Sequence, residues 1–528
     1  MTSPNNRGRT LNQARLAEFK EKFFAHTRHG QQLVDYLTRS GCGIWRYEAD
    51  PFDSRRWWLN ITLSSYVAEM FDAHLEIQLV YVEFERVEPR LFELVQQRIR
   101  KDARVDPGLF IVASLDPEVA RLARRRRGEF AVIDLLLGAL EPDVPEIRLR
   151  MSEILTSVDH FDITAPIKDP SGFFGRKAEY DRMISAIERG QSVGVFGLRK
   201  TGKTSLLNYV IGRRQESGRS VVKIDISGLS GADDFKRRTV EGAVKAVRDS
   251  DSRPLPRLRT LTATGEPKGG ADSLRSYWLR DVESITEHCG RLEIFIDEID
   301  QAYPPRSYLG IEEATQILIA LTQLRGMIQS ADPDSGIVLV CAGTDPALFE
   351  RPLLSTGADN LLYKVVRLMF LSPMSREEMA EMVRDLARRM GIRIRDHQVV
   401  DFLYDEYGGH PLLSRKACSV ATMVRPPGEV PWHMPLDAVV RAADARGDGT
   451  PFQQAGEILE SYTEWFPDEA DVLRALWSPD FDERELARLI IEEDGDRVRH
   501  AVPYGLLIPD ATKARVRAVE RFVNATGS

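Results

Sequence analysis

One octapeptide constrains the fold of this chain more than any other feature, the run GLRKTGKT at residues 197–204. It fits the pattern Gly-x-x-x-x-Gly-Lys-Thr, in which glycines allow successive backbone amides to turn inward around a chain of phosphates. Lys203 adds a positive charge for the β- and γ-phosphates, and the Thr204 hydroxyl suits a magnesium ion. The expected nucleotide-binding residues of this loop are Gly197, Lys200, Thr201, Gly202, Lys203, Thr204 and Ser205.

The residues on either side of the loop have the pattern that such a site requires. The run SVGVF at 192–196 is apolar and short, which is typical of a buried strand. After the loop, apolar residues recur at helical spacing, at Leu206, Leu207, Val210 and Ile211. We therefore expect a strand, the loop and a helix whose positive end points at the phosphates. A glycine-rich turn that contains a lysine by chance would lack this context.

A second apolar run, LEIFIDEID at 292–300, ends in acidic residues. A buried parallel strand would deliver Asp297 to the edge of the sheet, where it can hold a magnesium-bound water. Glu298 is then placed to polarise an attacking water. Two acids after a strand are commonly only a solvated strand end, but the phosphate loop favours the metal and base roles. Further core strands are expected at 221–226, 336–342 and 363–371.

The composition indicates a soluble protein of several domains. The chain has 528 residues, of which 43% are hydrophobic and 29% charged. No apolar run approaches the roughly 18 residues that span a bilayer, and the first residues do not resemble a secretory signal. We therefore expect a cytoplasmic protein that has no membrane partner.

Charge and cysteine usage exclude two other classes. The net charge of −8 argues against a nonspecific nucleic-acid coat, although it permits a local basic face. The four cysteines, Cys42, Cys289, Cys341 and Cys418, are far apart, so they do not form a metal clip or a redox motif.

The run FFGRKAE at 173–179 contains a hydrophobic-Gly-Arg-x-x-Glu box about twenty residues before the phosphate loop. It resembles the entry motif of AAA+ ATPases and of the related STAND signalling ATPases, which include archaeal-type ATPases. The resemblance covers residues 172–523 and implies a P-loop ATPase core at 172–371 that binds ATP or ADP with Mg²⁺. It also implies that Gly175 and Arg176 lie over the adenine.

The same resemblance implies roles for residues that follow the core strands. Thr344, at the tip of the fourth strand, would sense the γ-phosphate, although it can also be the cap of a helix before Asp345. Arg351 lies where AAA+ proteins often keep an arginine that reaches a neighbouring subunit, which would make the protein a homo-oligomer.

A helical lid is expected at 372–424, beginning with the capping box Ser375-x-x-Glu378. Its element Gly408-Gly409-His410-Pro411 resembles the one by which STAND ATPases bring the lid onto the nucleotide. The glycines can also end a helix. The resemblance makes Pro411 a nucleotide contact and Arg415 a second sensor of the phosphates.

The N-terminal α/β domain at 1–157 weakly resembles restriction-endonuclease-like folds, because a helix at 11–39 precedes a strand meander and then a βαβ unit. That superfamily uses an acid on one strand and Glu-x-Lys on the next to hold magnesium and organise water. Asp50 or Asp53 could supply the first acid, but residues 76–78 read Glu-Ile-Gln, without the lysine. The domain is therefore either an ATP-regulated nuclease or an interaction or sensing domain.

The segment 456–528 has the pattern of a winged helix-turn-helix, with helices at 467–477, 483–492 and 495–504 and a wing formed by 506–508 and 515–517. Five basic residues occupy positions of DNA contacts: Arg497, Arg499, Lys513, Arg515 and Arg517. The segment is acidic as a whole, so both intramolecular packing and DNA binding stay open.

Together these patterns predict an α/β ATPase that acts as a nucleotide switch. ATP hydrolysis would move the lid and the winged helix and so control the N-terminal domain, in defence or stress signalling by analogy with STAND proteins. The alternative is a DNA-associated ATPase, such as an origin-binding protein, a loader or a transposition helper.

Overall fold

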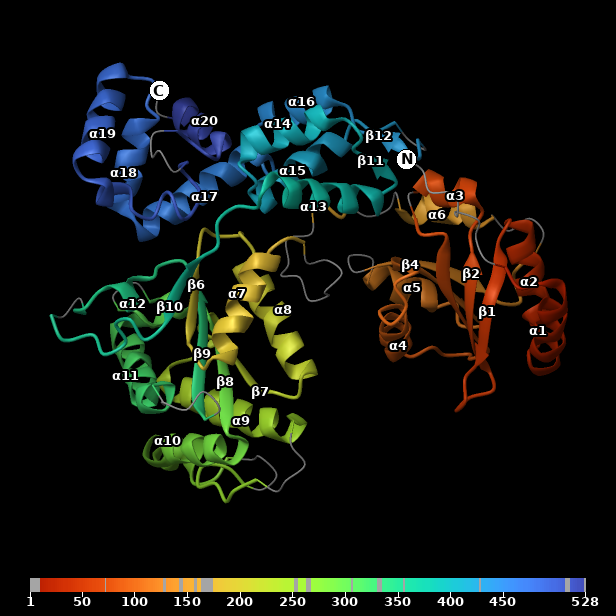
Figure 1. Ribbon diagram of the computed structural model, residues 1–528, viewed down its shortest axis with the longest axis horizontal. Coiled ribbons are helices and arrows are strands. Elements are labelled where there is room, and N and C mark those ends of the chain that lie inside the picture. Colours follow the sequence, from red (N-terminus) through yellow and green to blue (C-terminus); the bar gives the residue numbers. More distant parts are fainter. Residues whose placement is uncertain are drawn as a thin grey trace. The chain divides into compact units, whose positions relative to one another are not determined.

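The computed structural model describes residues 10–526 apart from 72, 127–129, 142–145, 156–158, 163–173, 251–254, 263–266, 305–306, 330–334, 355–356, 427–428 and 509–512 (Figure 1). It divides the chain into two compact units. One comprises Met1–Thr164, Ala380–Phe402 and Arg415–Asp444, and the other Ala165–Met379, Leu403–Ser414 and Ala445–Ser528. Phe173, the first residue of the run FFGRKAE, lies outside the described residues.

The first unit contains a five-stranded sheet in the order β1-β2-β3-β4-β5. Its strands are β1 (Gly43–Ala49), β2 (Arg56–Thr62), β3 (Glu76–Val82), β4 (Val105–Ser114) and β5 (Ala131–Leu136). β2 is antiparallel to β1 and β3, whereas β3, β4 and β5 are parallel. The expected order of a meander followed by a βαβ unit is therefore present.

Helices cover both faces of this sheet because alternate strand residues are apolar on each face. Leu79 and Tyr81 pack with α1 (Gln13–His26), α2 (Gly30–Arg39), α3 (Ser65–Phe71) and α6 (Ile147–Leu155). Val80 and Val82 pack with α4 (Arg90–Ile99) and α5 (Val119–Arg125). The single helix expected at 11–39 is two helices, since the segment 27–29 between them is not helical.

The second unit contains a five-stranded parallel sheet in the order β10-β6-β9-β8-β7. Its strands are β6 (Val193–Phe196), β7 (Ser220–Asp225), β8 (Arg291–Asp297), β9 (Gly336–Gly343) and β10 (Arg367–Phe370). β10 is shorter than the strand expected at 363–371, because residues 361–364 form a turn. All five strands end at one edge, so the residues that follow them are brought together there.

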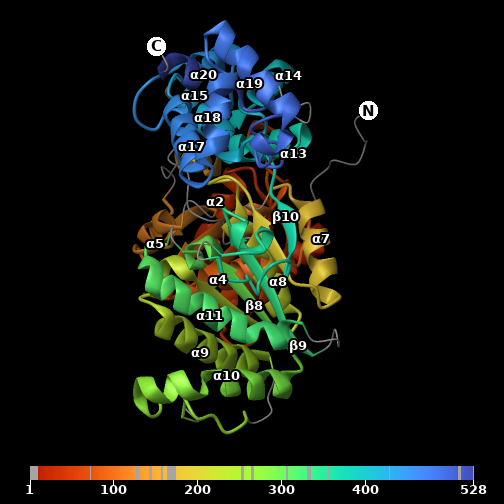
Figure 2. The same cartoon turned by 90° about the vertical axis from the view of Figure 1, so that its left-hand side faces the viewer.

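Both faces of this parallel sheet are covered, as buried parallel strands require. α7 (Lys177–Glu188) and α8 (Lys203–Glu216) pack on one face. α9 (Ala232–Ser250), α10 (Gly270–Cys289) and α11 (Gly310–Ile328) contact β7, β8 and β9 and lie together in Figure 2. The short helix α12 (Ala347–Glu350) follows β9.

The expected lid consists of α13 (Arg376–Arg388), α14 (His397–Tyr407) and α15 (Pro411–Thr422). Each of these three helices has residues in both compact units. The first unit also holds α16 (Leu436–Asp444) and a short parallel pair, β11 (Ile392–Arg393) and β12 (Trp432–His433).

The C-terminal segment is helical and differs from the winged pattern in two places. It contains α17 (Pro451–Trp465), α18 (Pro467–Leu476), α19 (Phe481–Glu493) and α20 (Arg517–Thr526). A 3₁₀ turn, η4 (Gly495–Val498), stands where a third helix was expected. The described part of the expected wing has one isolated bridge, between Leu507 and Ala514, and Arg517 begins α20.

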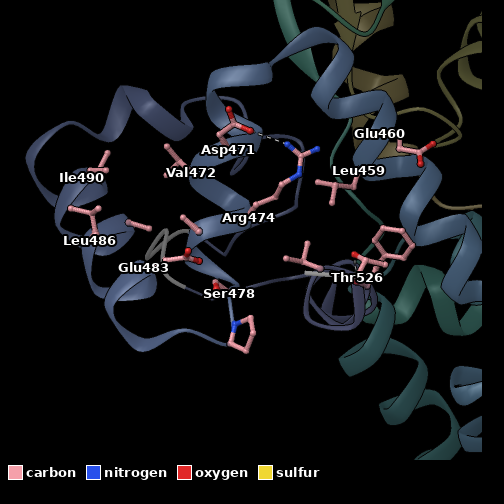
Figure 3. Close-up of a pocket in the computed structure, with 15 residues that line it drawn as sticks. Leu459, Glu460, Asp471, Val472, Arg474, Ser478, Glu483, Leu486, Ile490 and Thr526 are labelled. Atoms are coloured by element: carbon pink, nitrogen blue, oxygen red, sulfur yellow. Dashed lines mark hydrogen bonds and ion pairs between the residues drawn. The ribbon is translucent and has the colours of Figure 1, made fainter. Parts of the chain in front are cut away.

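A hollow of about 700 Å³ lies among these C-terminal helices and is lined by residues of α17 to α20 (Figure 3). Beside this hollow, the Arg474 guanidinium donates a hydrogen bond to Asp471 Oδ1 at 2.9 Å. None of its lining residues belongs to the phosphate loop. Among the described residues, we find no helix with the length and apolar character needed to cross a bilayer.

Candidate nucleotide site

The phosphate loop joins β6 to α8, as the sequence predicts. Gly197 is required by close packing, because a Cβ there would lie 2.9 Å from the Leu371 carbonyl oxygen. Lys200 and Gly202 have positive φ angles of 64° and 99°, which turn the backbone before α8 begins at Lys203. The Thr201 hydroxyl donates to the Leu198 carbonyl at 2.8 Å and closes the turn. Thr204 and Ser205 follow in the first turn of α8.

Lys203 is buried at the centre of the site. Its Nζ donates to the carbonyl oxygens of Gly197 and Leu198, each at 2.9 Å. Burial lowers its pKa, while the carboxylates of Glu298, Asp300 and Asp297 act in the opposite direction. A phosphate chain beside the loop would add further negative charge close to this ammonium.

The two acids of the second motif stand where the sequence predicts. Asp297 is the last residue of β8, and Glu298 follows with a φ of 53°. Burial raises the pKa of both carboxyl groups, and the Thr204 hydroxyl partly offsets this for Asp297 by a hydrogen bond. The contact brings the two predicted metal ligands together.

The residues present fit a magnesium ion that shares its shell with phosphates. Buried carboxyl groups with raised pKa values gain most from a nearby cation. Among the described residues there is no cluster of three or more His, Cys, Asp or Glu that would hold a metal alone. Mg²⁺ typically takes one or two protein oxygens and completes its shell with water and phosphate, which matches Thr204 and Asp297.

Asp300 is a site residue that the sequence reasoning missed. Its Oδ2 accepts hydrogen bonds from the backbone N–H groups of Thr344, at 2.8 Å, and Asp345, at 3.3 Å. Burial, with the charge of Glu298, raises its pKa to about 7. Asp300 therefore links the β8 acids to Thr344, the predicted sensor after β9. The signal was present in the sequence as a third acid two residues after Glu298.

Gly175 and Arg176 form a bridge across the site rather than an exposed turn. Both have a φ of 62°. The backbone N–H of Arg176 donates to Glu378 Oε1 at 2.9 Å, and its guanidinium donates to the carbonyl oxygens of Ser372 and of Thr201, the latter at 3.2 Å. Arg176 thus connects the loop to the segment after β10, a bond that the adenine role did not predict.

Pro411 begins α15, and the residue before it, His410, is a second site residue that sequence reasoning missed. Its side chain is 0% exposed, and the main chain of Arg199 in the phosphate loop faces its ring. The lid element therefore touches the loop.

The structure shows the surroundings of two arginines with predicted roles, the sensor Arg415 and the inter-subunit residue Arg351. Arg415 donates to the carbonyl oxygens of Phe161, at 3.1 Å, and His160, at 3.2 Å, so its guanidinium is held within the first unit. Arg351 is exposed after α12. Their sensor and inter-subunit roles stay predictions.

The acids proposed for a nuclease do not assemble. Asp50 accepts hydrogen bonds from Arg56 Nε at 2.8 Å and Trp58 Nε1 at 3.2 Å, and Asp53 pairs with Arg55. Glu76 pairs with Thr62 at the opposite end of β2. Asp50 and Asp53 therefore do not lie beside Glu76, because the antiparallel β1–β2 hairpin places them roughly 20 Å apart at about 3.3 Å per residue.

A family match covers these motifs. Residues 165–419 match the family model described as Novel STAND NTPase 1. The match includes the Arg176 bridge, the phosphate loop, the two acids and the lid element. This part of the chain is a P-loop ATPase of the STAND group. No curated protein sequence gave a significant match.

Three of the solved structures that are similar to this chain come from archaea. A Walker-type ATPase of Pyrococcus abyssi, PABY2304, has 16% identity and a TM-score of 0.46, over 69% of this chain and 99% of its own. The ORC2 protein of Aeropyrum pernix has 14% identity and a TM-score of 0.38, over 70% and 98%. Cdc6p of Pyrobaculum aerophilum has 13% identity and a TM-score of 0.34, over 69% and 96%.

Proposed function

We propose that this STAND ATPase is a nucleotide switch in which the presence of the γ-phosphate is transmitted from the sheet edge to the C-terminal helices. The observation that carries the proposal is a contact at the tip of β9. The buried Tyr504 hydroxyl donates a hydrogen bond to the carbonyl oxygen of Thr344. Thr344 is held in turn by Asp300, which lies beside Glu298.

A second contact joins the same two regions. The His500 ring lies between Glu469, whose Oε1 is 2.6 Å from Nδ1, and Glu350, whose Oε2 is 3.2 Å from Nε2. Arg499 also pairs with Glu350, the last residue of α12. Movement of the residues after β9 would therefore change the environment of Glu350, Glu469 and the His500 ring.

A third contact reaches the lid element. Arg515 donates to the carbonyl oxygens of Gly408, at 3.2 Å, and Pro373, at 3.3 Å. Arg499 and Arg515, which the DNA interpretation would use, are thus engaged within the chain. These bonds support intramolecular packing as the role of the C-terminal helices.

In this function ATP binds to the loop through Lys203, while Thr204 and Asp297 hold Mg²⁺. The metal supplies positive charge to the phosphates, and Glu298 orients the attacking water. Loss of the γ-phosphate then releases Thr344 and the contacts that depend on it. We extend the proposal to the N-terminal α/β domain as the effector or sensor, in defence or stress signalling, with homo-oligomers formed through Arg351.

Hydrogen exchange of the full-length chain tests the switch. Glu298→Gln with ATP and Mg²⁺ is compared with the wild-type chain in ADP. We expect amides at 344–351 and 495–508 to exchange at different rates in the two states, and Lys203→Ala to show no difference between nucleotides. Equal exchange at both segments, with nucleotide bound, would contradict the switch.

A DNA-associated function is the second candidate, and one surface supports it. A hollow of about 630 Å³ is lined by Arg484, Arg488, Lys513 and Arg517, with Asp405 and Glu520 as the acids. Basic clusters of this kind bind phosphates with a strong dependence on salt. Duplex DNA binding by the full chain that weakens with salt and with Arg484→Gln/Arg488→Gln would favour this function.

A further inference from the structure

We propose that the hollow of about 700 Å³ among the C-terminal helices is a docking groove for a basic amphipathic helix of a partner protein (Figure 3). The inference goes beyond the nucleotide switch and does not depend on it, because the described lining residues all lie between positions 459 and 526. It is carried by the apolar lining of the groove, the exposed leucines beside it and the charge of its rim.

Four helices form the walls of this groove, and each contributes apolar side chains. In Figure 3, Leu486 and Ile490 of α19 lie on one side and Leu459 of α17 lies on the other. Val472 of α18 and Val523 of α20 also line it. A helix that packed between α19 and α17 would bury its own apolar side chains against these residues. Amphipathic helices bind to hydrophobic grooves in this way, with anchors spaced three or four residues apart.

Exposed leucines of α19 extend this apolar surface beyond the hollow. Leu486 is 60% exposed and Leu489 is 55% exposed. Because residues three and four apart share one face of a helix, Leu486, Leu489 and Ile490 form a single stripe. A small molecule inside the hollow would leave the two leucines in water, whereas a helix laid along α19 would cover them. The surface therefore fits a helix better than a small ligand.

The rim of the groove is acidic. Glu460 and Glu483 line the groove, and both are exposed. Asp482 and Glu493 lie one helical turn before and after the two leucines, so they stand at the ends of the same stripe. Within the described part of the chain, none of these four carboxylates has an ion-pair partner. Their negative charge is therefore available to a ligand.

The cation beside the groove is already engaged. Arg474 donates to Asp471 Oδ1 at 2.9 Å and to the Thr463 hydroxyl at 2.6 Å. The two arginines of α19, Arg484 and Arg488, line the separate basic hollow. The groove thus presents negative charge around an apolar stripe. A helix with lysines or arginines beside its apolar face is attracted there, whereas the phosphates of nucleic acids and of anionic lipids are repelled.

Fluorescence anisotropy with a labelled model peptide tests the groove in the full-length chain. The probe carries leucine and lysine at helical spacing and has about 14 residues, roughly 20 Å as a helix, which matches the length of α19. We expect saturable binding that weakens as salt is added, because the lysines meet the acidic rim. A peptide with glutamate in place of lysine should not bind, and neither should one whose leucines are scattered around the helix. No saturable binding of the probe, or equal binding of the scattered peptide, would overturn the proposal.

The double variant Leu486→Ser/Leu489→Ser removes the apolar stripe. Both leucines are more than half exposed, so their replacement leaves the core of the C-terminal helices intact. We expect the affinity for the probe to fall about 10-fold or more, because a few anchors carry most of the energy of an interface. Ile311→Ser is the matched control, since Ile311 is 61% exposed on α11 of the ATPase core and should have no effect. Equal affinity in the double variant and the wild-type chain would contradict a role for the stripe.

The double variant Glu460→Gln/Glu483→Gln tests the charge of the rim and keeps its shape. We expect about a threefold loss of affinity and a weaker dependence on salt, because these carboxylates attract the lysines of the probe. Glu283→Gln/Glu287→Gln, at two exposed positions of α10, removes the same charge elsewhere and should have no effect. Unchanged binding in the rim variant would show that the groove does not select a basic partner.

A second copy of this chain is the other occupant that an apolar groove admits. Sedimentation velocity of the wild-type chain and of Leu486→Ser/Leu489→Ser distinguishes the two cases. We expect the two chains to have the same mass in solution. A wild-type oligomer that dissociates in the double variant would assign the groove to self-association and overturn the proposed partner.

Discussion

The two sheets of this protein arrange their acidic residues in opposite ways. In the ATPase unit, Asp297, Glu298 and Asp300 gather around the Lys203 ammonium. In the N-terminal unit, Asp50 pairs with Arg56 and Asp53 with Arg55. Glu76, the first residue of β3, pairs with Thr62 at the end of β2 that is away from the hairpin. The first arrangement can share its charges with a ligand, whereas the second satisfies each acid of the hairpin separately.

Strand direction explains the difference. Parallel strands all end at one edge of the sheet. The residues that follow β6, β8 and β9 therefore lie close together there because of strand direction alone. The antiparallel β1–β2 hairpin instead keeps its turn acids at one end while β3 begins at the other. Acids that follow different strands in the sequence can therefore be expected to lie together only when those strands are parallel.

Among the variants that test this difference between the two sheets, Glu298→Gln is expected to have the largest effect on ATP turnover. The amide cannot accept a proton from water, and general bases typically contribute about 100-fold or more to turnover. We expect steady-state ATP turnover to fall by at least that factor while ATP binding is retained. Turnover within a few-fold of wild type would show that the gathered acids do not perform the hydrolysis.

A second cation surrounded by acids, His500, gives a pH-dependent prediction. Burial alone would lower its pKa, but hydrogen bonds to Glu350 and Glu469 raise it from 6.5 to about 9. The folded-state pKa is above the unfolded value, so the stabilisation is complete below about pH 6.5 and is lost as the pH rises through 9. At low pH the raised pKa of His500 contributes about 3 kcal/mol to the free energy of unfolding.

Thermal unfolding between pH 6 and 9.5 measures this effect. The wild-type midpoint should fall with rising pH, and His500→Gln should remove much of that slope. His433→Gln, at an exposed position, serves as the control and should keep the wild-type slope. An unchanged slope in His500→Gln would show that the hydrogen bonds of His500 to Glu350 and Glu469 do not raise its pKa.

Tyr504→Phe is expected to have a smaller effect. It removes the hydrogen bond to the Thr344 carbonyl, which is worth about 1 kcal/mol, or about fivefold in an equilibrium. The difference in hydrogen exchange at 495–508 between ATP and ADP should shrink accordingly. Tyr308→Phe is the matched control, because its hydroxyl also donates to a backbone carbonyl, that of Ile226 at 2.7 Å. If both variants behave alike, Thr344 is not the route of coupling.

The smallest effect is expected in the N-terminal sheet. Asp50→Asn and Glu76→Gln should leave ATP turnover unchanged within about twofold, because these residues contribute nothing to the gathered acids. Neither the wild-type chain nor the variants should cleave DNA when Mg²⁺ is added. Metal-dependent cleavage that disappears in Glu76→Gln would break the comparison between the two sheets.

The sequence predicts the nucleotide site well where chemistry is local. The loop at 197–204, the strand before it and the acids after β8 each follow from periodicity and residue type. The bonds that sequence reasoning missed are long-range: Arg176 reaches Ser372, Asp300 reaches Thr344, and His410 faces Arg199. Such pairs depend on which strands are neighbours, and periodicity does not encode that order.

The predictions that differ from the structure share another cause. The helix expected at 11–39 is interrupted at 27–29, and the third C-terminal helix is a 3₁₀ turn. In both places tertiary packing overrides a continuous apolar pattern. The His500 ring contacts both Glu469 and Glu350. The backbone near His500 takes the conformation that allows these contacts and does not continue as a helix.

The most direct test of the account is the binding of ATP with Mg²⁺ to the full-length chain and to Lys203→Ala, measured by titration calorimetry. The account predicts saturable one-site binding by the wild-type chain and at least a 100-fold loss of affinity in the variant, since the buried ammonium is the charge at the centre of the gathered acids. Equal affinity in both chains, or no binding by a folded wild-type chain, would contradict it.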